Sequence, residues 1–375
     1  MRSSGLFAVL LGGALWAQAP AALEPGSSLH INLPDDSPVT LVKADMGQSR
    51  AEARGGALVL DLRALLTLRN SGSRSIRGVS LLVMAQEVTP GGKGSVTVPS
   101  LHIRPGETFP VRVDLRLLRP AAVIGGPLVQ VALDGVLFDD LGFFGPNRLN
   151  SRRAMLQWEL EARRDRRHFQ AMLDNGGIEG LRKELLASLS RQAERPRVDV
   201  QVSRAGRVTN VEPERELRFA FLHLPGAPLE AVAGVARSSG SELRAPSIEV
   251  RNKSDREIRY VEMGWLVRDR QGREFLAGSL PADVALRPGQ KSMVSQTTSM
   301  KLMERAGQPV PVDSMTGYVA TVEFTDGKMW LPSREELSQP RLQKALAPSP
   351  EEQRLTEIYR KKGLSAVVDE LNRLR

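Results

Sequence analysis

The stretch RNSGSRSIRGV, from Arg69 to Val79, recurs as RNKSDREIRYV, from Arg251 to Val261. Arg, Asn, Arg, Ile, Arg and Val stand at the same places in both stretches, 182 positions apart. Asparagine tolerates positive φ and bonds turn backbone with its side chain, so each stretch predicts a strand end, a turn and a new strand. Because the chain repeats this pattern, we expect two copies of one domain.

The repeat continues in the same order along the chain. RPG at residues 104–106 matches RPG at 287–289, and VLFDDLGFFGP at 136–146 matches VEFTDGKMWLP at 322–332. After each sandwich, GIEGLRKEL at 177–185 aligns with GLSAVVDEL at 363–371, 186 positions later. The order is kept and the separation only grows, which favours duplication over chance.

Each copy has the pattern of short β-strands followed by helices. Between Leu58 and Leu68 the even positions are apolar, the period-two pattern of a strand with one face in a core. Turn sequences separate such runs, which is typical of an antiparallel sandwich. Residues 151–173 then have helical spacing, and Gly177 and Gly363 each interrupt a helical pattern.

The sequence therefore predicts a mainly β protein with α: two tandem duplicated antiparallel β-sandwich (Ig-like) domains, each followed by a helical hairpin. The expected segments are a signal peptide (1–21), an N-terminal arm and first sandwich (22–150), a first helical hairpin (151–192), a linker and second sandwich (193–332), and a C-terminal helical segment (333–375). The Pro-, Gly- and Ala-rich stretch LPGAPLEAVAGVARSSGS, residues 224–241, is expected to be a linker or long loop.

The Asn/Ser/Arg turn, the following β segment and the closing Phe-x-x-Asp/Gly with an aromatic residue resemble Ig-like or fibronectin-like sandwich modules of uncharacterised exported bacterial proteins. The resemblance covers both copies. It implies a non-catalytic module, and it carries over no functional residues.

The N-terminus predicts export. Met1 to Gly5 precedes an apolar run from Leu6 to Trp16 and small-residue cleavage sites, the pattern of a secretory signal peptide. That run is shorter than the roughly 20 residues of a transmembrane helix, and no later stretch is apolar enough. The chain has no cysteine, whereas eukaryotic secreted domains usually depend on disulfides. We therefore expect a bacterial protein that is periplasmic or secreted, without a transmembrane segment.

The net charge of +9 leaves two interpretations open. One is a polyanionic partner, which for an exported protein means an anionic membrane or polysaccharide surface rather than nucleic acid. The other is GC-rich coding, since 42 arginines stand against 10 lysines. The candidate contacts for an anionic surface are the arginines of the first predicted helix, Arg152, Arg153, Arg163, Arg164, Arg166 and Arg167. These arginines either contact such a surface or form the solvated outer face of a helix whose apolar side packs on its own sandwich.

The common catalytic and metal-binding patterns do not occur. None of the four histidines has a second ligand at metal-binding spacing, and there is no Gly-x-Ser-x-Gly. Asp140 and Asp326 recur between the copies, but each precedes a glycine in a predicted hairpin turn, so a turn is favoured over catalysis. We therefore expect no catalytic, metal or cofactor-binding residues and no cofactor.

These observations favour an exported binding or scaffolding protein that acts on a protein or cell-envelope polymer. Two alternatives stay open: an accessory region of a carbohydrate-active hydrolase, and a peripheral envelope protein attached through the Arg-rich helix.

Overall fold

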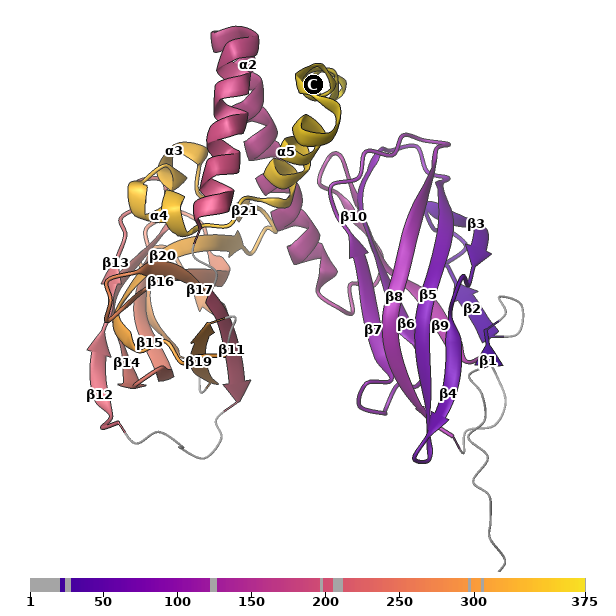
Figure 1. Ribbon diagram of the computed structural model, residues 1–375, viewed down its shortest axis with the longest axis horizontal. Coiled ribbons are helices and arrows are strands. Elements are labelled where there is room, and N and C mark those ends of the chain that lie inside the picture. The colour runs from indigo at the N-terminus through magenta and orange to yellow at the C-terminus, as the bar shows by residue number, and fades with distance from the viewer. Residues whose placement is uncertain are drawn as a thin grey trace, which may run out of the picture. The chain divides into compact units, whose positions relative to one another are not determined.

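A computed structural model of the protein describes residues 21–23, 28–121, 127–195, 198–204, 212–295, 298–304 and 307–374. Residues 1–20 lie outside the described part, so the predicted signal peptide does too. The chain divides into two compact units, residues 1–155 and 156–375, and each has its own sandwich (Figure 1). The protein is mainly β with α, as predicted.

The first unit contains two sheets. Its strands are β1 (Ala21–Ala22), β2 (Leu29–Asn32), β3 (Val39–Asp45), β4 (Arg50–Arg54), β5 (Ala57–Asn70), β6 (Ile76–Met84), β7 (Lys93–Val98), β8 (Thr108–Pro120), β9 (Val129–Phe138) and β10 (Phe143–Phe144). In one sheet β5 pairs with β8 and also with β3 and β4, and β1 pairs with β4. In the other the order is β10-β9-β6-β7, with β2 parallel to β9.

The alternation predicted for β5 is present. Leu60, Leu62, Leu66 and Leu68 are buried, while Leu65 between them is exposed. The buried side chains meet those of β6 and β9 in one core, because the pleat sends alternate residues to opposite faces of the sheet.

The second unit contains the other two sheets. Its strands are β11 (Val198–Arg204), β12 (Arg215–Arg218), β13 (Ala220–Phe221), β14 (Leu229–Ser239), β15 (Glu242–Asn252), β16 (Ile258–Asp269), β17 (Glu274–Leu286), β18 (Lys291–Ser295), β19 (Thr298–Glu304), β20 (Val312–Phe324) and β21 (Met329–Trp330). One sheet has the order β11-β19-β15-β14-β12, with β18 also on β15, and the other has β13-β20-β16-β17, with β21 on β20. Their facing sides enclose a core around Trp265.

The strand pairings of the two sandwiches correspond. β16 lies between β17 and β20 as β6 lies between β7 and β9, and β13 is parallel to β20 as β2 is parallel to β9. β3 and β14 begin at corresponding positions of their partner strands: Val39 pairs with Asn70 of β5, and Leu229 pairs with Asn252 of β15. Each then has a register shift, a β-bulge, that leaves Val42 or Val232 without a Cα partner.

The prediction of a loop at residues 224–241 was therefore wrong over β14. Its small residues serve close packing: a Cβ on Gly234 would lie 2.7 Å from the ring of Phe219 and 3.0 Å from that of Phe221. Glycine in a strand often marks such a close approach, whereas composition alone suggested a linker.

The repeated turn is held in the same way in both units. Asn70 is fully buried, and its Nδ2 donates to the carbonyls of Arg74 (2.9 Å) and Ile103 (3.1 Å). Asn252 is also fully buried, and its Nδ2 donates to the carbonyls of Arg256 (2.7 Å) and Leu286 (2.9 Å). The predicted asparagine–backbone bonds are confirmed, and each asparagine joins its own turn to a second segment of its sandwich.

The aspartates of the predicted hairpin turns lie beside these turns. Asp140 accepts a bond from the Gly142 amide (2.8 Å) and pairs with Arg74 (3.1 Å), whose guanidinium carbon lies 3.7 Å from the ring centroid of Phe138. In the second unit Asp326 pairs with Arg256, which stacks on Phe324 at 3.9 Å. Both aspartates thus serve turn structure, as the hairpin interpretation expects.

The helices are α2 (Ser151–Glu194), α3 (Arg334–Leu337), α4 (Pro340–Ala345), α5 (Pro350–Lys362) and α6 (Leu364–Arg373). α2 is a hairpin, since Gly177 (φ 60°, ψ −159°) separates two helical arms. Gly363 (φ 85°, ψ −179°) separates α5 from α6 in the same way. Both predicted breaks are confirmed.

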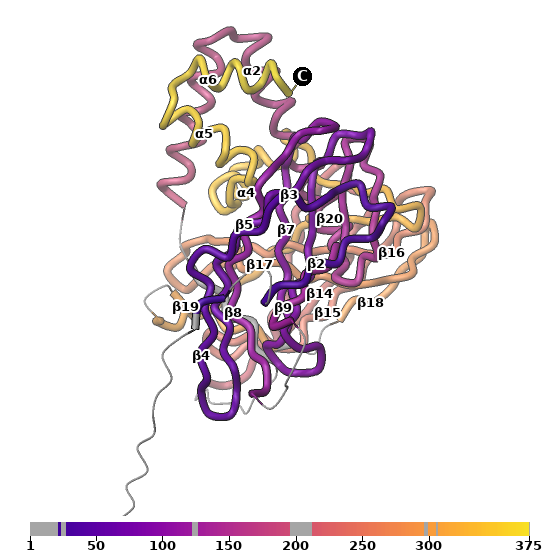
Figure 2. The backbone as a smooth tube through the Cα atoms, turned by 90° about the vertical axis from the view of Figure 1, so that its right-hand side faces the viewer, coloured from indigo at the N-terminus to yellow at the C-terminus, as the bar shows by residue number. Residues whose placement is uncertain are grey.

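The two hairpins share one core. Within the second unit, α5 and α6 lie beside α2 (Figures 1 and 2). The buried residues come in pairs 186 positions apart, three from α2 and three from α5 and α6: Phe169 and Leu355, Leu181 and Val367, Leu185 and Leu371. The sequence had assigned each hairpin to its own sandwich, and the structure instead packs them against each other.

Candidate functional site

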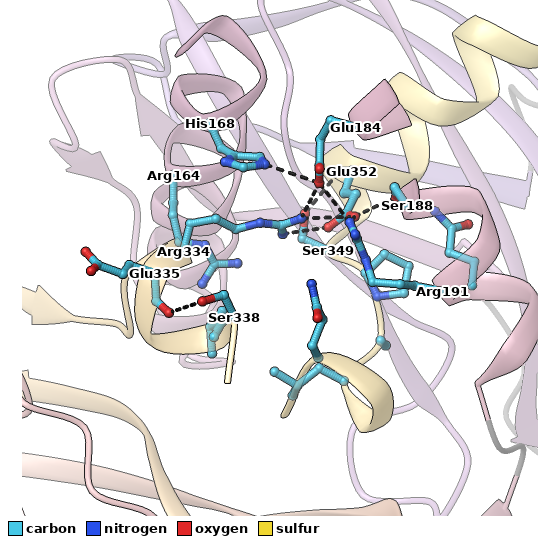
Figure 3. A pocket seen from close by; sticks show the side chains of 16 residues that line it. Arg164, His168, Glu184, Ser188, Arg191, Arg334, Glu335, Ser338, Ser349 and Glu352 are labelled. Carbon is cyan, nitrogen blue, oxygen red and sulfur yellow. Dashed lines mark hydrogen bonds and ion pairs between the residues drawn. The ribbon is translucent and has the colours of Figure 1, made fainter. Parts of the chain in front are cut away.

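A hollow of about 410 Å³ lies where α2 meets α3, α4 and α5 in the second unit (Figure 3). We call it the helical pocket. It is lined by Arg164, His168, Glu184, Ser188, Arg191, Gln192, Arg334, Glu335, Leu337, Ser338, Gln343, Leu346, Ala347, Pro348, Ser349 and Glu352. Local capping positions two of these segments: Ser333 and Glu336 form a capping box at the start of α3, and the Ser349 hydroxyl accepts from the Glu352 amide at the start of α5.

Arg334 is the centre of an ion network in this pocket. It lies 2.7 Å from a carboxylate oxygen of Glu352, 3.5 Å from Asp165 and 3.7 Å from Glu184. Arg191 contacts the same two glutamates, Glu184 at 2.9 Å and Glu352 at 3.4 Å. In Figure 3 the side chains of Glu184 and Arg191 from α2, Arg334 from α3 and Glu352 from α5 converge.

The two glutamates of the network have lowered pKa values. Burial alone would raise the pKa of Glu184, but hydrogen bonds and charge from His168 and Arg191 outweigh burial and lower it to about 2. Burial likewise opposes ionisation of Glu352, yet Arg334, the Ser188 hydroxyl and Arg191 lower its pKa. A general acid or base at neutral pH needs a pKa near 7, so these glutamates fit a structural role and not proton transfer.

A second ion cluster lies where α2 meets α5 and α6. Arg354 contacts Glu351 at 2.7 Å and Glu370 at 2.5 Å, and Arg166 of α2 contacts Glu351 at 3.5 Å. The pair Arg354–Glu370 stands 186 positions after the pair His168–Glu184, which is separated by 3.3 Å. Polar side-chain pairs as well as apolar residues therefore correspond between the two hairpins.

The six predicted arginines are placed as follows. Arg163 pairs with Glu159 (2.8 Å), Arg164 with Asp165 (3.0 Å), and Arg166 with Glu159 (3.0 Å) and Glu351. Arg152 and Arg153 are half-buried and interact within the chain, and Arg167 is exposed. Three of the six thus neutralise carboxylates of the second unit; contact with an external anionic surface stays a prediction.

Sequence reasoning missed Arg334, the residue that joins the network. A signal was present, because Ser333 to Glu336 reads as a capping box and places Arg334 at the first position of a helix. Nothing in the local pattern indicated its partners, because one of them, Asp165, lies 169 positions earlier in the sequence.

Across the described ranges no group of three or more His, Cys, Asp or Glu side chains is placed to hold a metal ion. In the same ranges, no helix is both long and apolar enough to span a membrane.

Comparison with known proteins identifies no family. No family model matches the sequence, and no curated protein matches it. A putative ApaA protein from Bordetella pertussis aligns at 13% identity over 37% of this chain and 91% of its own, with a TM-score of 0.18. A β-glucosidase from Kluyveromyces marxianus aligns at 10% identity over 72% of this chain and 45% of its own, with a TM-score of 0.16. Likenesses this weak carry no argument about fold or activity.

Proposed function

We propose that the protein is an exported, non-catalytic binding or scaffolding protein that acts on a protein or cell-envelope polymer. In this proposal two Ig-like sandwiches with their helical hairpins arose by tandem duplication. The paired hairpins hold the second unit together, and the sandwiches present strand edges to the partner.

One observation carries the proposal: the polar residues that recur between the copies are used in the fold. The recurring asparagines bond turn carbonyls, the recurring arginine–aspartate pairs close hairpins, and the recurring Glu184 and Glu370 pair within the hairpins. A duplicated catalytic module would be expected to keep reactive groups that line an open site. The contacts that recur here hold turns and helices in place. This favours a protein that binds its partner through its surface over one that carries a duplicated active site.

The corresponding strand orders, registers and bulges support the duplication. A shared bulge is a strong sign, because bulges are specific local features that persist within families. The bulges at Val42 and Val232 lie at the same register position, three residues after a strand residue opposite a buried asparagine.

The strand edges at these bulges are the proposed contact surface. Among the described strands, β3 pairs only with β5, and residues 229–234 of β14 pair only with β15. Open edges offer unpaired backbone groups that can accept another chain's strand. Val42 is 55% exposed and Val232 is 44% exposed, so each edge also presents an apolar side chain.

Site-specific photo-crosslinking in the native envelope tests the proposal. A photoreactive amino acid is placed at Val42 or Val232, with Val88 as control, because Val88 is 83% exposed but lies outside the strands. We expect the same envelope component to be captured at Val42 and Val232 and not at Val88. Val42→Lys and Val232→Lys should each lower the yield of the captured component, since edge lysines discourage strand pairing.

The opposing outcomes are distinct. Equal capture at all three positions, or none at any, would contradict binding at the edges. Salt-sensitive binding to anionic liposomes would favour attachment through α2, and turnover of a glycan panel would favour the hydrolase alternative.

A further inference from the structure

A second hollow, of about 260 Å³, lies between the β16–β17–β20 sheet of the second unit and its helices. Its polar lining includes Glu161 of α2, Glu262 of β16, Ser279 of β17 and Tyr318 of β20. We call these four residues and the space between them the acidic cleft.

Tyr318 presents an unused donor to this cleft. The residue is only 5% exposed, and its hydroxyl makes no hydrogen bond to any residue that the structure describes. Burial, together with the negative charges of Glu262 and Glu161, raises its pKa, so the hydroxyl keeps its proton. Gly264 makes room for this hydroxyl, since a Cβ there would lie 2.5 Å from it. This hydroxyl is therefore free to donate to a ligand or water in the hollow.

The two carboxylates of the cleft lack a cationic partner. Glu161 accepts from Gln157 Nε2 at 3.3 Å, and Glu262 accepts from the Ser279 hydroxyl and, at 3.5 Å, from the Tyr260 hydroxyl. Over the described part of the chain, neither forms an ion pair. This differs from the helical pocket, where arginines contact both Glu184 and Glu352.

The arginine that lines the cleft is engaged elsewhere. Arg164 Nε lies 3.0 Å from Asp165, and Arg164 Nη1 donates to the Pro332 carbonyl at 3.2 Å. The cleft therefore combines two carboxylates without a cation and one hydroxyl donor without an acceptor.

We propose that the acidic cleft binds a protonated primary amine that carries an acceptor oxygen beside it, as in an amino sugar. The ammonium group donates to Glu161 and Glu262, and the neighbouring oxygen accepts from the Tyr318 hydroxyl. The volume admits a group of about one sugar ring. None of these residues belongs to the strand edges of the proposed function, so each proposal can be tested independently of the other.

Binding is coupled to the ionisation of Glu161. Burial raises the pKa of Glu161; Asp165 on its own helix and Glu262 from the sheet add to this, while Arg164 and the Gln157 bond oppose it. Tyr318, which also faces the cleft, stays neutral. An ammonium group next to Glu161 lowers that pKa, because opposite charges favour the ionised form. Amine binding should therefore release protons from the protein.

Calorimetric titration of the full-length protein with glucosamine tests the proposal, with N-acetylglucosamine as the probe without positive charge and putrescine as the probe without an acceptor oxygen. We expect glucosamine to bind more tightly than either. Glu161→Gln and Glu262→Gln should each weaken glucosamine binding by about tenfold or more, and Tyr318→Phe by a few-fold. Glu335→Gln, which removes an exposed carboxylate outside the cleft, should have no effect.

Proton release gives a second readout. Titration in buffers of different ionisation enthalpy should show net release on glucosamine binding, reduced in Glu161→Gln. Equal affinity for glucosamine and N-acetylglucosamine, no glucosamine binding at millimolar concentration, or unchanged affinity in folded Glu161→Gln and Glu262→Gln would overturn the proposal. Putrescine binding as tight as glucosamine would overturn the role of Tyr318.

Discussion

The two fully buried asparagines decide how each sandwich holds its turn. Asn252 satisfies the carbonyls of Arg256, in the turn before β16, and of Leu286, at the end of β17, and its Oδ1 accepts from the Ser254 amide at 2.9 Å. A side-chain amide supplies two donors and an acceptor in one group, so no carboxylate or aliphatic side chain can replace it. This explains why the turn recurs with its asparagine intact.

Replacing Asn252 by Asp tests that role with a side chain of nearly the same shape. The variant loses both donors and leaves buried carbonyls unpaired, so we expect about 2–4 kcal/mol less unfolding free energy. Urea unfolding followed by the fluorescence of buried Trp265 measures it. Asn175→Asp, at the exposed hairpin tip, is the control and should be neutral. Equal midpoints for both variants would mean that the turn does not depend on Asn252.

At the scale of elements, one glycine sets the form of each hairpin. Gly177 and Gly363 adopt positive φ with extended ψ, a region that is essentially restricted to glycine. Other residues can fill helix positions on both sides, but the reversal itself needs a residue without Cβ. The local sequence therefore specified the helix breaks with little help from the rest of the molecule.

Substitution at adjacent glycines separates this backbone requirement from helix propensity. Gly177→Ala should destabilise the second unit by about 1–3 kcal/mol through backbone strain. Gly176→Ala should be neutral or stabilising, because Gly176 has no positive φ and open space around it. Thermal unfolding followed by helical circular dichroism measures both. A Gly177→Ala protein as stable as Gly176→Ala would rule out the strained turn.

At the scale of the whole molecule, the described residues form three apolar cores, one in each sandwich and one shared by the hairpins. Two ion networks link the hairpin helices: Arg334 contacts Glu352 of α5 and Asp165 of α2, and Glu351 of α5 contacts both Arg354 and Arg166 of α2. Burial opposes ionisation of Glu184, Glu352 and Glu370, but their hydrogen-bonding and cationic partners outweigh it and lower the pKa of each. The assembly of the hairpins is therefore sensitive to acid.

The lowered pKa of Glu184 sets the pH range of that sensitivity. Because the folded pKa of about 2 lies below the ordinary value of 4.5, its contribution is full above pH 4.5 and is lost as pH falls toward 2. We expect the unfolding free energy of the second unit to drop by about 2 kcal/mol from this group over that range. In Glu184→Gln the pH slope should be shallower and stability at pH 7 lower. Glu179→Gln, an exposed site on the same arm, should keep the wild-type slope; identical slopes in all three proteins would contradict the network's role.

The sequence by itself determined the features that depend on near neighbours: the alternation of β5, the asparagine turns, the glycine breaks and the repeat that relates them. Tertiary structure decided which surfaces meet. The apolar faces around Phe169 and Leu355 indicate that one face of each hairpin is buried, but an amphipathic pattern does not show which surface it packs against. The same holds for β14, for Arg334 and for the acidic cleft, whose carboxylates come from residues about a hundred positions apart. Their packing is fixed by side chains brought together only when the chain has folded, and no local pattern contains that information.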